Sequence, residues 1–175
     1  MLGKNILMVV APRNFRDEEL LQPKQVFHKS GFRVTVASKA VAEASGVLGA
    51  TVAVDVDLAD ASSQDFDAVV FVGGPGAEVY FEDEQALALA RTFNEQGKVT
   101  AAICIAPTIL ANAGVLKGRR ATVWSSMTNH DCVNALKKGG AMFTNEPVTV
   151  DGKIVTGNGP DAAQKFAEAV LKALG

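Results

Sequence analysis

Short apolar segments alternate with amphipathic ones along almost the whole chain. Four of the apolar segments are short, rich in Val, Ile and Ala, and typical of strands buried on both faces of a sheet: Asn5 to Val10, Arg33 to Ala37, Ala68 to Val72, and Val99 to Ile103. Helical spacing separates them, over Glu18 to Ser30, Asp83 to Gln96 and Pro107 to Ala113. Gly31 and Gly97 directly follow the first two and favour helix ends there.

The last third of the chain continues the alternation. The pattern predicts a strand, a helix, two strands that form a hairpin around Asp151-Gly152, and a final helix: Ala121 to Trp124, Asn129 to Lys138, Val148 to Val150 with Lys153 to Thr156, and Pro160 to Leu174. Repeated strand–helix–strand units predict a doubly wound, mostly parallel sheet with right-handed crossovers and helices on both faces. We expect one α/β domain over residues 1–175.

In such open sheets, ligands bind beyond the carboxyl ends of the strands. Three loops should therefore meet at that edge: Ala11 to Glu19, Gly73 to Gly76, and Cys104 to Thr108. Candidate catalytic residues are therefore expected in these loops.

Composition narrows the function classes. A formal net charge of −2 offers no basic field for nucleic acid or for an anionic membrane surface. The early apolar run from Ile6 to Ala11 is far shorter than the roughly 18 residues of a membrane span, so we expect no membrane segment. Two cysteines without other signs of a secreted scaffold favour reduced thiols in the cytoplasm. With only two histidines, few ligands exist for a metal, and we expect none.

Cys104 is the first candidate for chemistry. It directly follows a predicted strand and precedes a predicted helix, with small residues at Ala102 and Ala106, as a nucleophile elbow requires. A thiol at a helix N-terminus also feels the helix dipole, which favours the thiolate. The alternative is that Cys104 is a small buried hydrophobic residue.

Glu19 is the second candidate. It lies on the inward side of the first predicted helix, beside the apolar stripe of Leu20 and Phe27. A carboxyl there is either a first-turn acid that accepts hydrogen bonds from backbone N–H groups, or a buried acid with a raised pKa that contacts the Cys104 sulfur. The spacing leaves both alternatives open.

Gly73-Gly74-Pro75-Gly76 follows the third strand. The glycines allow close approach of the backbone, and the N–H groups of Gly74 and Ile105 are candidates for an oxyanion hole; a plain tight turn is the alternative. The segment matches neither a Walker loop nor a dinucleotide fingerprint, so no nucleotide cofactor is expected. The side chains expected to line the pocket are Arg13, Phe15, Pro75, Trp124 and His130.

Taken in order, these features resemble the DJ-one/ThiJ/PfpI superfamily over nearly the whole chain. The matching segments are Phe15-x-x-x-Glu19-x-x-x-Pro23, Gly31-Phe32-x-Val34, Asp65-Phe66-Asp67 before Gly73-Gly74, Ala101-Ala102-Ile103-Cys104 with Pro107, Asp151-Gly152-Lys153, and Gly159-Pro160. The resemblance implies a flavodoxin-like sandwich that forms a homodimer. It also implies a reactive Cys104, a Glu19 carboxyl that contacts its sulfur, and an oxyanion hole from Gly74 and Ile105.

The resemblance leaves the reaction open. Peptidase-like members place a histidine directly after the nucleophile, where this chain has Ile105, and others place one where this chain has Trp124. We therefore expect an enzyme that uses Cys104 and Glu19 on a small reactive carbonyl, in a glyoxalase-like or deglycase-like reaction. The alternatives are an intracellular cysteine peptidase or amidase, and a non-catalytic redox sensor or chaperone that uses oxidation of Cys104.

Overall fold

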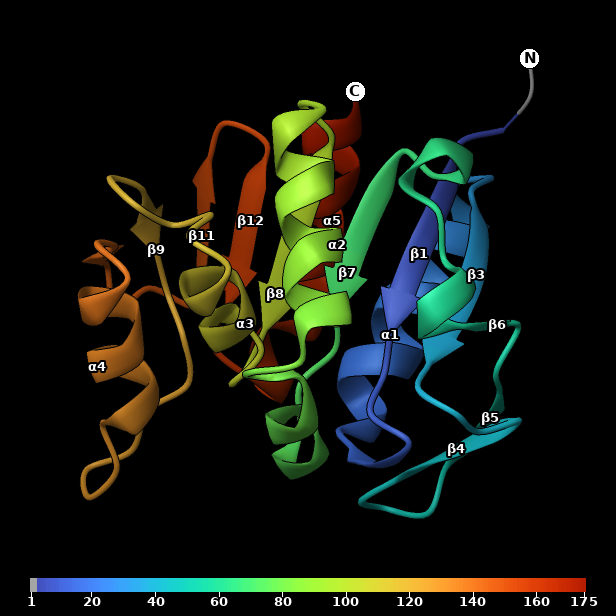
Figure 1. The fold of residues 1–175 in the computed structure, drawn as a ribbon, viewed down its shortest axis with the longest axis horizontal. Coiled ribbons are helices and arrows are strands. Elements are labelled where there is room, and N and C mark those ends of the chain that lie inside the picture. Colours follow the sequence, from blue (N-terminus) through green and yellow to red (C-terminus); the bar gives the residue numbers. More distant parts are fainter. Residues whose placement is uncertain (1–2) are drawn as a thin grey trace.

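A single twisted sheet forms the centre of the molecule in the computed structural model, which describes residues 3–175 (Figure 1). It has seven strands: β1 Asn5–Val9, β3 Arg33–Ser38, β6 Val56–Asp57, β7 Ala68–Phe71, β8 Val99–Ile103, β11 Val148–Asp151 and β12 Ile154–Gly157. Their order is β11-β12-β8-β7-β1-β3-β6. Neighbouring strands are parallel except in the β11–β12 hairpin. The predicted mostly parallel α/β fold is confirmed.

Helices cover both faces of the sheet (Figure 1). On one face lie α1 Asp17–Lys29 and α5 Ala163–Leu174; on the other lie α2 Glu84–Glu95 and α3 Pro107–Asn112, with α4 Asp131–Lys138 packed against α3. Strand β1 contributes to both apolar layers, since Leu7 and Val9 pack with α2 and α3 while Ile6 and Met8 pack with α1 and α5. Burial on both faces explains why the strand is a continuous apolar run. None of the helices in residues 3–175 is long and apolar enough to cross a membrane.

The predicted strand from Ala121 to Trp124 is wrong in extent and in place. Only Arg120–Ala121 forms a strand, β9, and it pairs with β10 Met142–Phe143 in a separate two-stranded sheet. The backbone N–H of Thr122 donates to Thr156 Oγ1 (3.0 Å), and that of Trp124 donates to the Cys104 carbonyl (2.8 Å). These bonds take the place of a strand ladder and hold Trp124 beside the end of β8.

Two other boundaries move by a few residues. In the hairpin, Asp151 still pairs with Ile154, so the two loop residues are Gly152 and Lys153 rather than Asp151-Gly152. The final helix begins as a 3₁₀ turn, Pro160–Ala162, and becomes α-helical at Ala163. A third sheet, absent from the sequence prediction, joins β2 Arg13–Phe15, β4 Glu43–Gly46 and β5 Thr51–Ala53. Its strands are too short for a period-two pattern to identify.

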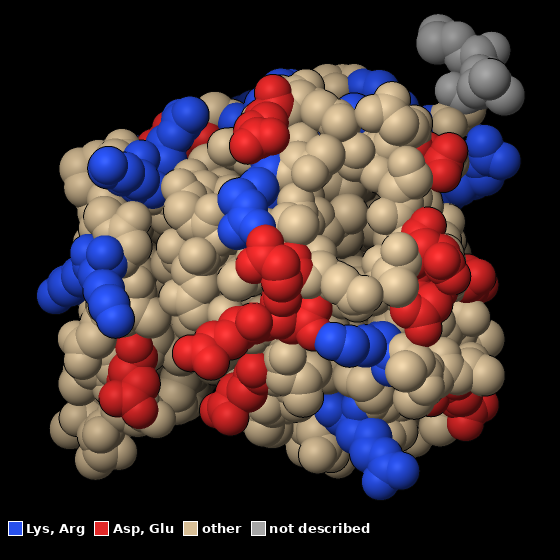
Figure 2. Space-filling model, viewed as in Figure 1, with Lys and Arg blue, Asp and Glu red and all other residues tan. Residues whose placement is uncertain are grey.

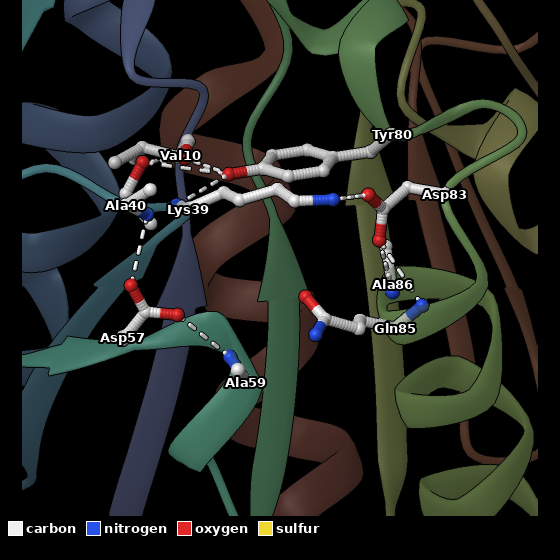
Figure 3. A network of polar contacts seen from close by, with 10 residues as sticks. Val10, Lys39, Ala40, Asp57, Ala59, Tyr80, Asp83, Gln85 and Ala86 are labelled. Atoms are coloured by element: carbon white, nitrogen blue, oxygen red, sulfur yellow. Dashed lines mark hydrogen bonds and ion pairs between the residues drawn. The ribbon is translucent and has the colours of Figure 1, made fainter.

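A polar network connects the carboxyl ends of β1 and β3 to the segment before α2 (Figure 3). The Tyr80 hydroxyl donates to the Val10 carbonyl (2.8 Å) and accepts from the Lys39 N–H (3.2 Å), while Lys39 Nζ pairs with Asp83. Asp83 in turn caps α2 by accepting from the Gln85 and Ala86 N–H groups. The network thereby fixes the 3₁₀ helix η3 Pro75–Tyr80, which begins at the predicted ligand-binding edge.

Tyr80→Phe is expected to lower the free energy of unfolding by about 1–2 kcal/mol, because it removes one buried hydrogen bond and leaves the Lys39 N–H without its acceptor. Urea denaturation of the two proteins measures the difference. A change below about 0.3 kcal/mol, with an unchanged dependence on urea, would show that the network contributes little to stability.

Candidate active site

Cys104 lies at the junction between β8 and α3 in a backbone conformation that is rare for its type. Its φ is 64°, in the left-handed region that costs a non-glycine residue about 1–2 kcal/mol. Two backbone hydrogen bonds hold it there: its N–H donates to the Gly157 carbonyl (2.9 Å), and its carbonyl accepts from the Trp124 N–H (2.8 Å). The backbone N–H groups of Gly74 and Ile105 lie near its sulfur and act to lower the pKa of the thiol.

The glycines after β7 are required by close backbone contacts. A Cβ atom on Gly73 would lie 2.5 Å from the Cys104 Cβ and 2.9 Å from Glu19 Oε2. Gly74 adopts a φ of 100°, and a Cβ there would lie 2.3 Å from the Arg16 nitrogen. The lack of a side chain at both positions lets the chain before α1, the turn after β7 and Cys104 come together, as expected for the three loops.

The three acids in the first turn of α1 have different partners. Asp17 accepts from the N–H groups of Leu48 and Ala50 (2.9 and 2.8 Å), and Glu18 forms two hydrogen bonds with Arg16 (2.8 and 3.0 Å). Glu19 is completely buried, and neither of its oxygens has a nitrogen or oxygen partner within residues 3–175; its polar neighbour is the Cys104 thiol. The alternative that Glu19 caps backbone N–H groups is therefore wrong.

Burial raises the pKa of Glu19 to about 8, against a smaller lowering by the Cys104 contact and by Arg16. Glu19 is consequently mostly protonated at neutral pH, with the Cys104 thiol as its polar neighbour. Burial, together with the negative charge of an ionised Glu19, raises the pKa of Cys104 to about 12, although the two N–H groups lower it. The expected thiolate stabilisation by the helix dipole is thus outweighed, since α3 has only 6 residues and the thiol is 8% exposed.

Cys104 opens into a cavity of about 1030 Å³ between η3, α3 and α4. Of the side chains expected to line the pocket, Pro75 and Trp124 do so. Arg16 and Thr108 belong to the loops that were expected to meet at this edge, and Phe81 was a further candidate for the lining. The sequence did not indicate the remaining members: Glu78, Val79, Glu82, Asn112, Asn129, Asp131, Cys132, Ala135 and Pro160. They come from η3, the turn before α2, α3, the segment before α4, α4 and the 3₁₀ turn at Pro160, which only the folded chain brings together around Cys104.

Three expected lining residues lie elsewhere. Phe15 is fully buried in the apolar layer under α1. Arg13 is exposed on β2 and does not line the cavity, whereas Arg16, directly before α1, does. His130 is the exposed residue directly before α4 and does not line the cavity. His28 lies in the last turn of α1, at the opposite end of the helix from Glu19. Neither histidine of the chain therefore lines the Cys104 cavity. Cys132 is a second free thiol in the cavity wall.

Comparison with known proteins identifies the family. The DJ-1/PfpI family model matches residues 4–173. The chain is 39% identical to an uncharacterized protein of Methanocaldococcus jannaschii, covering 99% of this chain and 84% of that protein. It is 34% identical to a protein of Thermococcus kodakarensis that is named a deglycase, covering 96% of this chain and 98% of the relative.

A solved structure indicates the same family. The crystal structure of a ThiJ/PfpI domain protein from Brachyspira murdochii superimposes with a TM-score of 0.93 at 36% identity, covering 98% of both chains. With a family match over nearly its full length, the chain belongs to the DJ-1/PfpI family.

Proposed function

We propose that this protein is a cysteine-dependent enzyme that acts on small reactive carbonyl compounds, in a glyoxalase-like or deglycase-like reaction. The observation that carries the proposal is the pairing of the Cys104 thiol with a completely buried Glu19 carboxyl whose pKa is about 8, at the inner end of a cavity. A carboxyl with a pKa near the working pH is suited to both giving and taking a proton. Relatives that are named deglycases support the same class of reaction.

With methylglyoxal, the steps follow from these two groups. When the Cys104–Glu19 pair has lost one proton, Glu19 is the carboxylate, and it takes the proton of the Cys104 thiol as the sulfur attacks, which leaves a thiolate beside a neutral carboxyl. The thiolate adds to the aldehyde carbon, and Glu19 gives its proton to the new alkoxide, which forms a hemithioacetal. The Glu19 carboxylate then removes the proton on that carbon and returns it to the adjacent one, while the hydroxyl proton on the first carbon passes to the oxygen on the second. The resulting thioester is hydrolysed by water to lactate, which frees Cys104.

The proposal also assigns roles to Cys104 and to the backbone N–H groups around it. Cys104 serves as the nucleophile on a strand-to-helix elbow, and the N–H groups of Gly74 and Ile105, which lie near its sulfur, also stabilise the developing oxyanion. A peptidase or amidase reaction is less well supported, because no histidine of the chain lines the cavity. Protonation of a leaving amine would therefore depend on Glu19 alone.

The test compares wild-type protein with the Cys104→Ser and Glu19→Gln variants, incubated with methylglyoxal while lactate is followed by NMR. We expect Cys104→Ser to fall to the rate of the reaction without protein, and Glu19→Gln to lose about 100-fold or more. Turnover that persists in Cys104→Ser would overturn the proposal. If the wild-type protein is inert toward carbonyls but peroxide adds two oxygens at Cys104 alone, the redox-sensing alternative replaces it. A fluorogenic peptide tests the peptidase alternative in the same set.

We also propose that the protein works as a homodimer in the cytoplasm, as the family resemblance implies. The apolar side chains that α1 and the β4–β5 turn leave exposed, Leu21, Val47 and Leu48, support an interface on that side. Light scattering on the purified protein measures the mass directly.

A further inference from the structure

Two acidic side chains are buried among residues 3–175, and both lie in the first turn of α1. Asp17 is 5% exposed, and Glu19 is completely buried. The other acids are at least partly exposed, and Figure 2 shows several of them gathered at the centre of one face, around the N-terminal end of α2. Burying a charged carboxyl is costly unless it has partners. Glu19 lies beside Cys104, whereas Asp17 takes no part in the proposed steps.

Asp17 connects the start of α1 to the turn between β4 and β5. Its carboxylate oxygens accept from the N–H groups of Leu48 (2.9 Å) and Ala50 (2.8 Å). A Cβ atom on Gly46 would lie 2.3 Å from Asp17 Oδ1, so the lack of a side chain at Gly46 leaves the space that the carboxylate occupies. Burial by itself raises the pKa of Asp17, but these two N–H groups hold it below its usual value, and the side chain is ionised at neutral pH.

Glu19, by contrast, has no anchor of this kind. Neither of its oxygens has a nitrogen or oxygen partner within residues 3–175, and its polar neighbour is the Cys104 thiol. The placement of its carboxyl therefore depends on apolar packing and on the backbone of the first turn of α1. Any group that fixes this turn also fixes the distance between the carboxyl and the sulfur.

The first turn of α1 is fixed at two points. Arg16, the residue directly before the helix, directs its side chain to Glu18 and not to the helix backbone. Its N–H donates to the Gly73 carbonyl (2.9 Å), which ties the start of the helix to the loop beside Cys104. The second point is the pair of bonds between Asp17 and the β4–β5 turn.

We infer that Asp17 is a positioning residue for Glu19: its bonds to the β4–β5 turn hold the first turn of α1 so that the Glu19 carboxyl stays beside the Cys104 sulfur. The catalytic consequence rests on the proposed function, because the proton exchange requires that contact. Without these bonds the turn shifts and Glu19 moves away from the sulfur. A misplacement of about 1 Å at a reacting group can lower a rate by about 100-fold.

The placement of Glu19 is measured without turnover, through the reactivity of Cys104. In a Cys132→Ser background Cys104 is the only thiol of the chain. Its alkylation by iodoacetamide is followed at pH 9, above the pKa of Glu19, which is about 8. Burial and the ionised Glu19 both raise the pKa of the thiol. Asp17→Asn is expected to move Glu19 away, to lower the pKa of Cys104 and to raise the alkylation rate by about tenfold.

The same substitution in a Glu19→Gln background shows whether Asp17 acts through Glu19. The amide carries no charge, so its displacement leaves the pKa of the thiol unchanged. We expect Asp17→Asn to alter the alkylation rate there by less than about twofold. A merely structural role would raise the rate equally in both backgrounds, and that result would overturn the inference. So would an alkylation rate that Asp17→Asn does not change in the presence of Glu19.

Asp57→Asn is the matched control. Asp57 also accepts from two backbone N–H groups, those of Ala40 and Ala59 (both 2.9 Å), but it lies at the end of β6 and does not line the cavity. Its substitution is expected to leave Cys104 alkylation at the starting rate. An increase equal to that of Asp17→Asn would show that general loosening of the fold exposes the thiol, and the positioning role would be rejected.

Gly46→Ala tests the same contact with Asp17 itself intact. The new methyl group overlaps the Asp17 carboxylate and displaces it from the β4–β5 turn. We expect a faster alkylation that again requires Glu19, and no further increase when Gly46→Ala is added to Asp17→Asn. If Asp17→Asn does not fold, Gly46→Ala in the two Glu19 backgrounds gives the same comparison, and equal rate increases in both contradict the inference.

Turnover separates the inference from the function on which it rests. With methylglyoxal, kcat is expected to fall about tenfold or more in Asp17→Asn while KM stays within about twofold, because the cavity itself is unchanged. If Asp17→Asn raises alkylation through Glu19 but the wild-type protein turns over no carbonyl, the proposed function fails and the positioning role stands. If the wild-type protein turns over methylglyoxal and Asp17→Asn changes neither kcat nor alkylation, the positioning role alone fails.

Discussion

Gly73→Ala is expected to lower the free energy of unfolding by about 3 kcal/mol and to separate Cys104 from Glu19. The new methyl group would meet the Cys104 Cβ at 2.5 Å, the Ile103 carbonyl oxygen at 2.6 Å and Glu19 Oε2 at 2.9 Å. All three belong to buried residues, so the methyl group has no free space. Urea denaturation measures the loss of stability, and the rate of Cys104 alkylation at pH 8 measures the change at the site.

Gly114→Ala is the matched control for that substitution. Gly114 has a φ of +81°, but a Cβ atom there has nothing within 4 Å, so the variant carries backbone strain without a clash. We expect a loss of about 1 kcal/mol and unchanged Cys104 reactivity. If Gly73→Ala unfolds no more easily than Gly114→Ala and alkylates at the wild-type rate, the close approach of these loops does not position Cys104.

The fold was largely predictable because burial on both faces of the sheet leaves a strong signal. The strands β1, β3, β7 and β8 are continuous apolar runs, and parallel strands separated by helices allow few topologies. The strand expected at Ala121 to Trp124 was not predictable in this way. Its apolar residues Ala121 and Val123 pack in the core. Its backbone N–H groups, however, donate to Thr156 Oγ1 and to the Cys104 carbonyl instead of to a neighbouring strand, and no local sequence pattern indicates these partners.

The part of the site that could be predicted consists of residues whose positions relative to the predicted strands and helices indicate that they lie close together. Cys104 and Gly74 were identified because each lies in the segment that follows a strand, and Glu19 because it lies on the inward side of the first helix near its start. The pKa values of these groups could not be predicted from the sequence, because the pKa of a thiol depends on how deeply packing buries it. Here burial outweighs the helix dipole and raises the pKa of Cys104. Three acidic residues of the cavity wall were also missed. Glu78, Glu82 and Asp131 have no special pattern in the sequence, and they line one cavity only because the fold brings η3, the turn before α2 and α4 to the same place.

The burial of Glu19 has a consequence for stability that can be measured independently of any activity. Its pKa is raised from 4.5 to about 8 in the folded protein. Below pH 4.5 the folded and unfolded chains both hold the proton. Between that value and about pH 8 only the folded chain keeps it, so the free energy of unfolding falls as the pH rises, by about 1.4 kcal/mol per pH unit. Across the whole window Glu19 removes roughly 4 kcal/mol of the stability that is present at low pH.

Glu19→Gln is therefore expected to become more stable relative to wild type as the pH rises. The amide has the size of the carboxyl and no proton to lose, so the difference between the two proteins should grow by roughly 3 kcal/mol between pH 5 and pH 8, while contributions from all other groups cancel. Glu18→Gln is the control. Its pKa is lowered by the hydrogen bonds from Arg16, so its titration falls below this window and its difference from wild type should stay constant. Urea denaturation at pH 5, 6, 7 and 8 gives both series. A constant difference for Glu19→Gln would mean that folding does not raise the pKa of Glu19, and the proposed role of Glu19 in both giving and taking a proton near neutral pH would lose its basis.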